Sequence, residues 1–504
     1  MSTKPKFGDG GWEPHQNEFN LMLWYPDFQL RALAQIFVNT VPKANTWISN
    51  YNDVQRILLV TPYTPNSTSD VYLPYLYEYA LCILAGNPIP SDEISMLNLF
   101  VLTDPRFGGV AEYQSPASPG RYNDAAWTAM LNAMEDSGSG AVGIIPQSQY
   151  GYAFQNAPTP LTHNYLGIQG YGSGRSRLVW EPTSAGANQF LKVDSAGTGD
   201  TTSIGCSIRG IQIEGWNPDY LTAAQKNNRH AKSAIYSSCT SHLHIDDVTV
   251  KHWATGSATY GAEGGSIGIE SRGKEFLYVD KAVFLTDKPV VLRRNTKELS
   301  SFDADTYNFT NFDFRMPIGA DKYADEYAFT LEGDLEIHEV RIGDEFNVSG
   351  GSGVFIWDTA ALTRGSSGLT IEHGRAEQQY GTSKWNIRIN LPGSYKLQKL
   401  LVNKFTCNFE TGGIYLGGVF QSKLSDVTFP RTSLQASSQN GLEFAAGTGY
   451  PNGVQDITLD NFLIPDLNPG VPTPLFNFGG ATVKFTTADA QVGKNQLSSR
   501  MLIG

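Results

Sequence analysis

Residues 243–250 read Leu-His-Ile-Asp-Asp-Val-Thr-Val, in which two short alternating segments are separated by a polar pair. The same apolar spacing returns between residues 200 and 465, and its copies begin at Cys206, Leu243, Leu277, Tyr307, Leu335, Leu369, Leu400, Ser422 and Ile457. A repeat of this kind is typical of a solenoid, whose units bury their apolar faces only by stacking on one another. Alternation with a period of two residues predicts strands that point every second side chain inward.

The residues around these copies strengthen the prediction. The copies are rich in Ile, Val and Phe, which suit strands, and the polar pairs contain turn-forming residues such as Asp246-Asp247 and Thr310-Asn311. A further short strand precedes most copies, as in Gly353–Ile356 and Gly413–Leu416. Three strands per repeat, joined by bends, predict a mostly β protein with a right-handed single-stranded parallel β-helix. An antiparallel sandwich and a β-propeller remain as alternatives.

Composition excludes several classes of protein. The chain has 504 residues and a net charge of −12, so it lacks the basic surface that binds nucleic acid. No apolar stretch is long enough to insert into a membrane, and the first residues do not read as a signal peptide. The four cysteines are far apart and show no spacing typical of a metal site or a disulfide framework. We therefore expect no metal and no cofactor.

The N-terminal part of the chain has a different character from the repeats. Residues 1–20 read as a flexible arm, and residues 21–105 carry helix-like apolar spacing together with many Trp, Tyr and Phe residues. This pattern predicts a small, mainly helical domain. Its aromatic surface is buried either inside a self-sufficient fold or against a partner, and the sequence leaves both readings open.

A helix is predicted at the start of the repeats. Asn123 is suited to begin it, residues 124–136 present Trp127 and Met130 on one face, and Gly138 ends it. A Gly-rich loop precedes this helix, and a short buried strand at residues 140–146 follows it. A helix at this place would cover the unpaired edge at which the first strand of a solenoid begins.

This order of loop, capped helix and strand resembles the start of the pectate-lyase-like right-handed β-helix superfamily, and Leu166–Gly172 looks like its first rung. Among its members, the plan is most similar to bacteriophage tailspikes. The resemblance implies an attachment domain over residues 21–105, a trunk over residues 106–485 with its capping helix at 124–136, and a tail over residues 486–504. It also implies a homotrimer.

Charged residues concentrate on the central repeats. The outward position between the last two apolar residues of each copy predicts that Asp313, Arg341 and Arg375 lie in one column, with a spacing of about 4.8 Å. Paired carboxylates suit glycoside hydrolysis, Arg and His suit the binding or elimination chemistry of acidic sugars, and Trp suits stacking on sugar rings. The candidate catalytic residues are Asp313, Glu339, Glu372 and Glu377, and the candidate substrate-binding residues are Arg341, Arg375, His338, His373, Trp357 and Trp385. Surface charges that alternate in sign and only keep the face soluble are the structural alternative.

Together these patterns predict a phage tailspike or tail-fibre protein of the virion. Its N-terminal domain would attach to the phage tail or baseplate, and its trunk would bind a bacterial surface polysaccharide and possess the residues to depolymerise it. A non-catalytic structural or receptor-binding virion protein on the same fold is one alternative. A free polysaccharide hydrolase or lyase is another, and the superfamily includes all three classes.

Overall fold

The computed structural model describes most of the chain between residues 99 and 485. The described residues are 99–104, 106–115, 118–136, 141–156, 158–180, 189–194, 203–215, 233–238, 240–251, 266–272, 276–294, 304–316, 326–359, 362–377, 385–407, 413–428, 442–445, 454–463, 476–477 and 482–485. The predicted arm, nearly all of the predicted N-terminal domain and the predicted tail lie outside them. The described residues fall into two compact units, of which the first includes residues up to Gln155 together with Tyr165–Val179 and Ser207–Gln212.

The first unit contains the predicted helix, α6 (Asp124–Asp136), which buries Trp127, Met130 and Met134. Its strands are β1 (Leu99–Val101), β2 (Val142–Ile144), β3 (Tyr152–Phe154), β4 (Gly167–Gln169), most of β5 (Arg177–Trp180) and most of β8 (Ser207–Glu214). Strands β1, β2, β4 and β8 pair in parallel, in that order. Helix α6 packs on β1 and β2, where Gly143 leaves room for the two methionines.

Asn123 precedes α6 and anchors it. Its backbone carbonyl accepts the first helical hydrogen bond from Trp127. Its buried side chain does not cap the helix but bonds to the backbone of Val110 and Ala153, at 2.7 Å and 3.2 Å. The helix start is therefore fixed by tertiary contacts as well as by local sequence.

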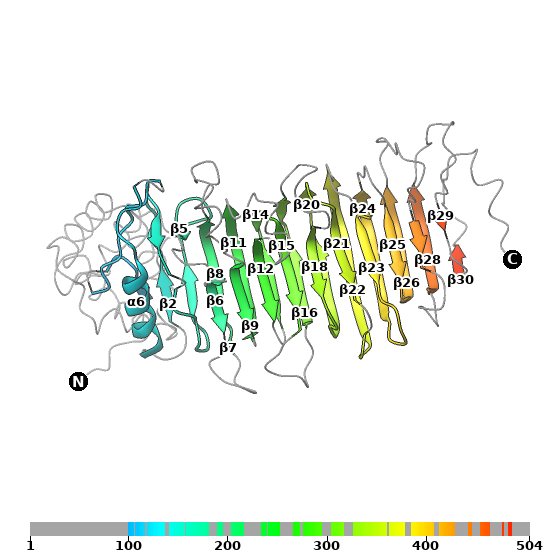
Figure 1. Cartoon of the computed structure of the whole chain (residues 1–504), viewed down its shortest axis with the longest axis horizontal. Coiled ribbons are helices and arrows are strands. Elements are labelled where there is room, and N and C mark those ends of the chain that lie inside the picture. Colours follow the sequence, from blue (N-terminus) through cyan, green and yellow to red (C-terminus); the bar gives the residue numbers. More distant parts are fainter. Residues whose placement is uncertain are drawn as a thin grey trace, which may run out of the picture. The chain divides into compact units, whose positions relative to one another are not determined.

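The second unit contains a ten-stranded parallel sheet, in which each strand pairs with the strand of the same sheet that comes next in the sequence (Figure 1). Its strands are β6 (Gln189–Asp194), β9 (Ser233–Ser238), β12 (Ile267–Arg272), β15 (Lys288–Arg293), β18 (Tyr327–Glu332), β21 (Gly353–Asp358), β23 (Ile387–Asn390), β25 (Ile414–Gly417), β27 (Leu442–Phe444) and β29 (Phe476–Asn477). A separate parallel pair joins β7 (Ser203–Ile204) to β10 (Thr240–Ser241).

Between these strands the chain forms the repeated pair of short strands. They are β11 (Leu243–Lys251), β13 (Leu277–Asp280), β14 (Val283–Leu285), β16 (Ala304–Thr310), β17 (Asp313–Arg315), β19 (Ile337–Gly343), β20 (Phe346–Ser349), β22 (Ser366–Glu377), β24 (Leu397–Cys407), β26 (Val419–Thr428), β28 (Gln455–Leu463) and β30 (Thr482–Phe485). Each rung thus has one strand of the ten-stranded sheet and a bent segment, which is either two short strands, such as β13 and β14, or one longer strand that continues through the bend, such as β22. Every pairing between rungs is parallel among the described residues. The predicted parallel β-helix is confirmed, and the sandwich and the propeller are excluded.

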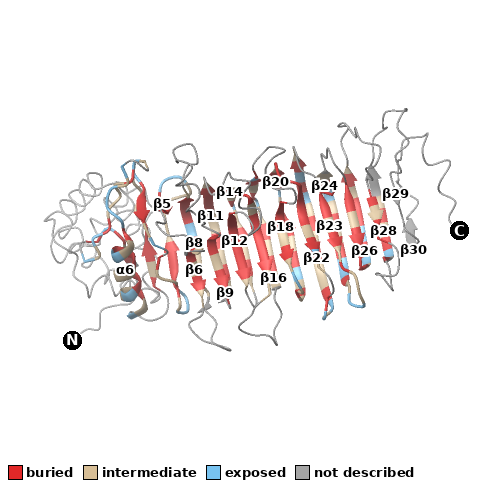
Figure 2. Ribbon diagram, in the orientation of Figure 1, coloured by how far each residue is buried: buried red, intermediate tan, exposed pale blue. Residues whose placement is uncertain are grey.

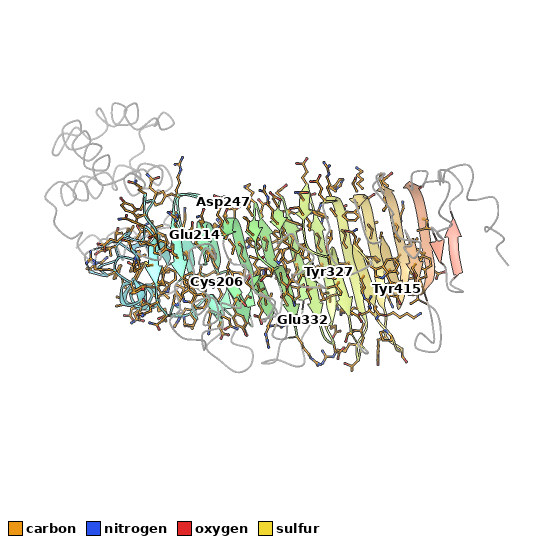
Figure 3. All side chains as sticks on the ribbon, turned by 45° about the horizontal axis from the view of Figure 1, so that its top comes forward. Cys206, Glu214, Asp247, Tyr327, Glu332 and Tyr415 are labelled. Atoms are coloured by element: carbon orange, nitrogen blue, oxygen red, sulfur yellow. The ribbon has the colours of Figure 1, made fainter. Side chains whose placement is uncertain are left out.

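The polar pair of each rung forms the bend between the two short strands. At the second residue of the pair the backbone is left-handed, with φ between 48° and 54° at Asp247, Lys281, Asn311, His373, Lys404 and Asp426. Figure 3 labels Asp247 at one of these bends. A single left-handed residue lets the chain turn while both flanking strands continue their pairing with the neighbouring rungs.

The interior is a stack of apolar side chains from successive rungs, and buried residues occur in each strand whose burial is described (Figure 2). The rings of Phe284 and Phe314 stack with centroids 4.9 Å apart, and so do those of Phe312 and Phe346. Gly374 occupies an apolar position of the repeat because a Cβ there would lie 2.0 Å from the ring of Phe346. The short rung spacing makes such identical stacks possible.

One predicted repeat is out of register. The apolar pattern indicates a copy beginning at Leu335, but Val340 pairs with Tyr307 on one side and with Leu369 on the other. The true copy therefore begins at Val340, and its bend contains two left-handed residues, Asp344 and Glu345. Leu335 is as buried as Val340, and the longer bend before Phe346 breaks the repeat spacing of the copy at Val340, so the spacing indicates the copy at Leu335 and only the partner strands reveal the true one.

Polar groups are also buried, at the position that precedes three strands of the ten-stranded sheet. Ser266, Asp287 and Glu326 occupy this position on successive rungs and are almost fully buried. The backbone N–H and the hydroxyl of Ser266 donate to Oδ2 of Asp287, both at 3.0 Å. Burial and the neighbouring charge of Asp287 raise the pKa of Glu326 to about 9. Glu326 is therefore a neutral acid at pH 7.

Among the described residues, no helix is long and apolar enough to cross a membrane.

Candidate functional site

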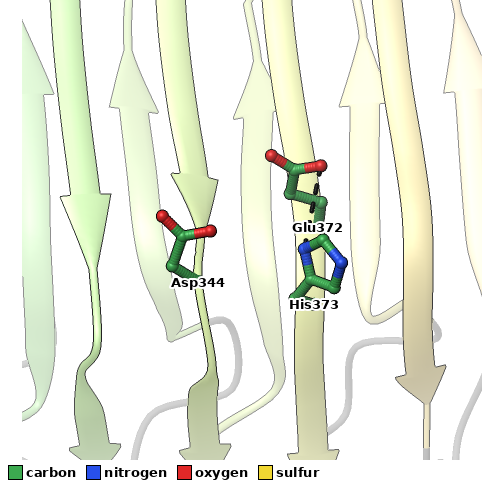
Figure 4. A group of neighbouring side chains, drawn as sticks. All are labelled: Asp344, Glu372 and His373. Carbon is green, nitrogen blue, oxygen red and sulfur yellow. Dashed lines mark ion pairs between the residues drawn. The ribbon is translucent and has the colours of Figure 1, made fainter.

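Arg341 is the centre of the most connected charged group in the short strands. On β19 its Nε donates to Oε1 of Glu372 at 2.8 Å, and its two terminal nitrogens donate to Asp344 at 2.7 Å and 3.0 Å. His373 follows Glu372 at the bend of the next rung, and its Nδ1 lies 3.8 Å from Oε2 of Glu372 (Figure 4). The hydrogen bonds that Arg341 donates to Asp344 and Glu372 raise its pKa.

The corrected register changes the predicted column. Asp313 pairs with Asn347, and Asn347 pairs with Arg375, so Asn347 lies where Arg341 was expected. Arg341 instead pairs with Asn308 and Thr370 on the first short strands. The prediction that Arg341 shares a column with Asp313 and Arg375 is therefore wrong, because the whole rung is shifted by its longer bend.

The column of Asp313 and Arg375 lies on the second short strands. Asp313 is bound by Arg315 at 2.9 Å and by the amide of Asn347 at 3.1 Å. Arg375 forms an ion pair with Glu377 two residues further along β22. Two oppositely ordered ion pairs thus flank a rung on which the outward residue, Asn347, is neutral.

Two predicted residues lie at the start of β19. His338 pairs with Asp305 of the preceding rung, with 3.3 Å between Nδ1 and Oδ1. Glu339 is exposed, and no hydrogen bond or ion pair joins its side chain to another described residue. Glu339 thus differs from the other three candidate carboxylates, which are all held by an arginine.

The two candidate tryptophans are interior residues. Trp357 is fully buried and its Nε1 donates to the carbonyl of Gly333 at 3.3 Å, while Trp385 is 6% exposed and packs on Tyr415. Neither ring has a free face at the surface, so we leave both out of the proposed site. Trp357 lies in β21 and Trp385 lies before β23, and the sequence did not show which side chains of these segments face inward.

The ten-stranded sheet carries a second charged cluster that the apolar spacing did not indicate. Glu270 is 2% exposed and accepts hydrogen bonds from Ser233 at 2.6 Å and from Arg293 at 2.7 Å. Arg293 also binds Glu332, which Figure 3 labels, at 2.7 Å. Burial would raise the pKa of Glu270, but Arg293 and Ser233 outweigh it and lower that pKa. A carboxylate so fully partnered holds neighbouring rungs together.

Asp344, Glu372 and His373 also have the geometry of metal ligands, since one ligand atom from each lies within 4.8 Å of the others. Arg341 already supplies a positive charge to both carboxylates, at distances of 2.7 Å and 2.8 Å. A cation would have to displace this guanidinium, so the group is better described as an ion-pair network.

Several solved structures are similar to this chain in fold. No family model and no curated protein matches the chain. The surface adhesin PfbA of Streptococcus pneumoniae is similar over 77% of this chain and 94% of its own, with 10% identity and a TM-score of 0.42. The A-module of the mannuronan C-5 epimerase AlgE4 of Azotobacter vinelandii is similar over 77% of this chain and 98% of its own, with 12% identity and a TM-score of 0.34.

A phage protein is also among the similar structures. Tailspike protein 2 of a bacteriophage of Escherichia coli O157:H7 is similar over 73% of this chain and 40% of its own, with 13% identity and a TM-score of 0.34. At these identities and TM-scores we rest no functional argument on any of the three. The strand pairings are sufficient to assign the fold. The chain is a parallel β-helix, as its sequence predicts.

Proposed function

We propose that the β-helix binds a bacterial surface polysaccharide along its short-strand face and cleaves it there. The observation that carries this proposal is that one outward column of this face carries its charges only on central rungs. The outward column of the second short strands reads Thr249, Val283, Asp313, Asn347, Arg375, Thr406 and Thr428 along successive rungs. A ladder that served only solubility would carry charge along its whole length.

The carboxylates of this face suit two roles in glycoside cleavage. Glu372 is ion-paired with Arg341, which holds its carboxylate in place for the role of a base or a nucleophile. Glu339 is exposed and has no such partner among the described residues, so its carboxyl group is accessible to the leaving sugar. We assign proton transfer to Glu339 and the charged role to Glu372, while Asp313 and Glu377 bind substrate hydroxyls beside Arg375.

We further propose that this trunk belongs to a phage tailspike or tail-fibre protein of the virion. The order of segments in the sequence supports this: a separate N-terminal region precedes a capping helix and a long β-helix. In this proposal the N-terminal region attaches to the tail or baseplate, and three copies assemble into a homotrimer.

A non-catalytic adhesin is the second candidate function. Asp313, Glu372 and Glu377 each form an ion pair with an arginine, which is typical of carboxylates that stabilise neighbouring strands. In this case the same face recognises the polysaccharide without changing it.

One experiment separates the two. The purified protein is incubated with a panel of bacterial capsules and lipopolysaccharide O-chains, and reducing ends and the ultraviolet absorbance of unsaturated uronates are followed. New reducing ends without absorbance indicate a hydrolase, and absorbance indicates a lyase. Binding without any product favours the adhesin, and the absence of both binding and product contradicts the proposed function.

A further inference from the structure

Two aromatic rings form a flat wall on the outward side of the rung that contains β13. The rings of Phe276 and Tyr278 are parallel, with an interplanar angle of 0° and centroids 6.4 Å apart, as expected for side-by-side residues on one strand face. His242 and His244 of the preceding rung stack behind them, at 4.3 Å and 4.8 Å. The histidines cover one side of the wall, so its other side faces the following rung.

The following rung carries short side chains. Tyr278 pairs with Asn308, and Asn308 pairs with Arg341. Leu277 pairs with Tyr307, so Thr306 lies on the rung after Phe276, and Thr306 pairs with Glu339 on the rung after that. The side chains of Thr306 and Asn308 are shorter than those of the rungs on either side. The outward surface is therefore lower at this rung than at the two aromatic rings before it and at Glu339 and Arg341 after it.

The dimensions of this lower part of the surface suit one sugar ring. Two rungs separate the aromatic wall from Glu339 and Arg341, which is about 9.6 Å along the direction of stacking. A ring in van der Waals contact with the wall lies about 3.5–4 Å from it. The remaining distance, about 5.6–6.1 Å, leaves room for a hydroxyl group of that ring between the ring and the side chains of the rung that contains Glu339 and Arg341.

The charges around this lower part of the surface favour a ligand without net charge. Arg341 is neutralised by Asp344 and Glu372, and Glu339 adds a further negative charge. An acidic sugar would be repelled by these carboxylates, whereas the hydroxyl groups of a neutral sugar would donate hydrogen bonds to Glu339.

We propose that Phe276 and Tyr278 stack on a neutral pyranose ring of the bound polysaccharide, which lies over Thr306 and Asn308 and hydrogen-bonds to Glu339 and Arg341. This inference deepens the proposed function and rests on it. It names the chemical class of the sugar, adds two binding residues that the repeat pattern did not indicate, and places the sugar next to the carboxylate to which we assign proton transfer.

The test uses the full-length protein and two kinds of probe. Saturation-transfer NMR measures binding of the neutral methyl glycosides of glucose, galactose, mannose and rhamnose, with methyl glucuronoside as the charged comparison. Affinity electrophoresis measures binding of the polysaccharide panel. The variants are Tyr278→Ala, Tyr278→Phe, which keeps the ring, and Tyr395→Ala, which removes a tyrosine that is 48% exposed elsewhere on the trunk.

We expect Tyr278→Ala to weaken binding of the polysaccharide at least about tenfold, while Tyr278→Phe and Tyr395→Ala stay within about twofold of wild type. Neutral glycosides should show transfer and the glucuronoside should not. Unchanged binding by Tyr278→Ala, or preferred binding of the glucuronoside, overturns the inference and leaves the proposed function standing.

Two further outcomes can be distinguished from those above. If Tyr278→Ala changes the oligomer mass measured by light scattering, the aromatic wall is a contact between copies of the chain, and the inference is wrong. If wild-type protein binds no polysaccharide of the panel and no glycoside, the proposed function itself fails.

Discussion

Arg341 and Glu372 join two neighbouring rungs although they lie 31 residues apart in the sequence, with 2.8 Å between Nε and Oε1. The contact depends on Gly343, because a Cβ at that residue would lie 3.0 Å from Cγ of Glu372 and 3.6 Å from Cζ of Arg341. The same guanidinium also binds Asp344. A missing side chain on one rung thus lets a charged group form across two rungs.

Removing Arg341 should turn this group into a cation site. In Arg341→Ala, Asp344 and Glu372 lose their counter-charge, and they form with His373 a ligand set whose atoms lie within 4.8 Å of one another. We expect millimolar Mn²⁺ or Zn²⁺ to raise the melting temperature of this variant by about 1–3 °C. Wild type and the control Arg375→Ala should not respond, and an equal response of wild type would contradict the description of this group as an ion-pair network.

Glu339→Gln should separate catalysis from binding. The substitution keeps the shape and removes the proton that we assign to the leaving sugar, so product release should fall about 100-fold or more while polysaccharide binding is kept. Glu443→Gln, on the ten-stranded sheet, is the matched control and should release product at the wild-type rate. Reducing-end assays together with affinity electrophoresis check both, and full activity of Glu339→Gln would remove this residue from the mechanism.

Gly374→Ala should destabilise the trunk. Its Cβ would lie 2.0 Å from the ring of Phe346, and relieving this overlap costs about 1–3 kcal/mol. Gly365→Ala is the control because a Cβ there meets nothing within 4 Å. Thermal and denaturant unfolding measure both variants. A second substitution, Phe346→Leu, should restore part of the stability lost in Gly374→Ala. Equal stability of the two alanine variants would contradict this prediction and would mean that the ring of Phe346 moves aside at little cost in free energy.

Glu326 should make the trunk less stable at alkaline pH. Its pKa is about 9 in the folded chain and near 4.5 in an exposed glutamate, so the folded state holds this proton more tightly. The stabilisation from the bound proton is complete below pH 4.5 and is lost as the pH rises toward 9. The melting temperature of wild type should therefore fall between neutral and alkaline pH.

Glu326→Gln is the direct comparison, because its amide cannot ionise. The variant should lose less stability than wild type over the same pH range, whereas Glu345→Gln, an exposed residue of a bend, should follow wild type. Parallel curves for Glu326→Gln and wild type would mean that Glu326 does not titrate in this range.

The candidate site shows where prediction from the sequence succeeded and where it stopped. The concentration of charge on the central repeats is readable because each copy marks its own outward positions. The neighbours of each charge could not be predicted, because the repeat spacing fits Leu335, whereas pairing with Tyr307 and Leu369 shows that the copy begins at Val340. The aromatic wall was missed for a related reason: Phe276 and Tyr278 belong to one copy, and the histidines behind them to another.

The sequence by itself determined the parallel β-helix, since an apolar period of two residues, turn-forming pairs and regular repetition are properties of the chain read in one direction. It also determined helix α6, whose buried face is a local feature, while the contacts of Asn123 with Val110 and Ala153 help to fix the start of the helix. Only the tertiary structure decided which outward residues meet, which tryptophans are interior and which carboxylates are neutralised. These depend on which residues of neighbouring rungs pair with each other, and a longer bend, such as the one that contains Asp344 and Glu345, changes the neighbours of outward side chains.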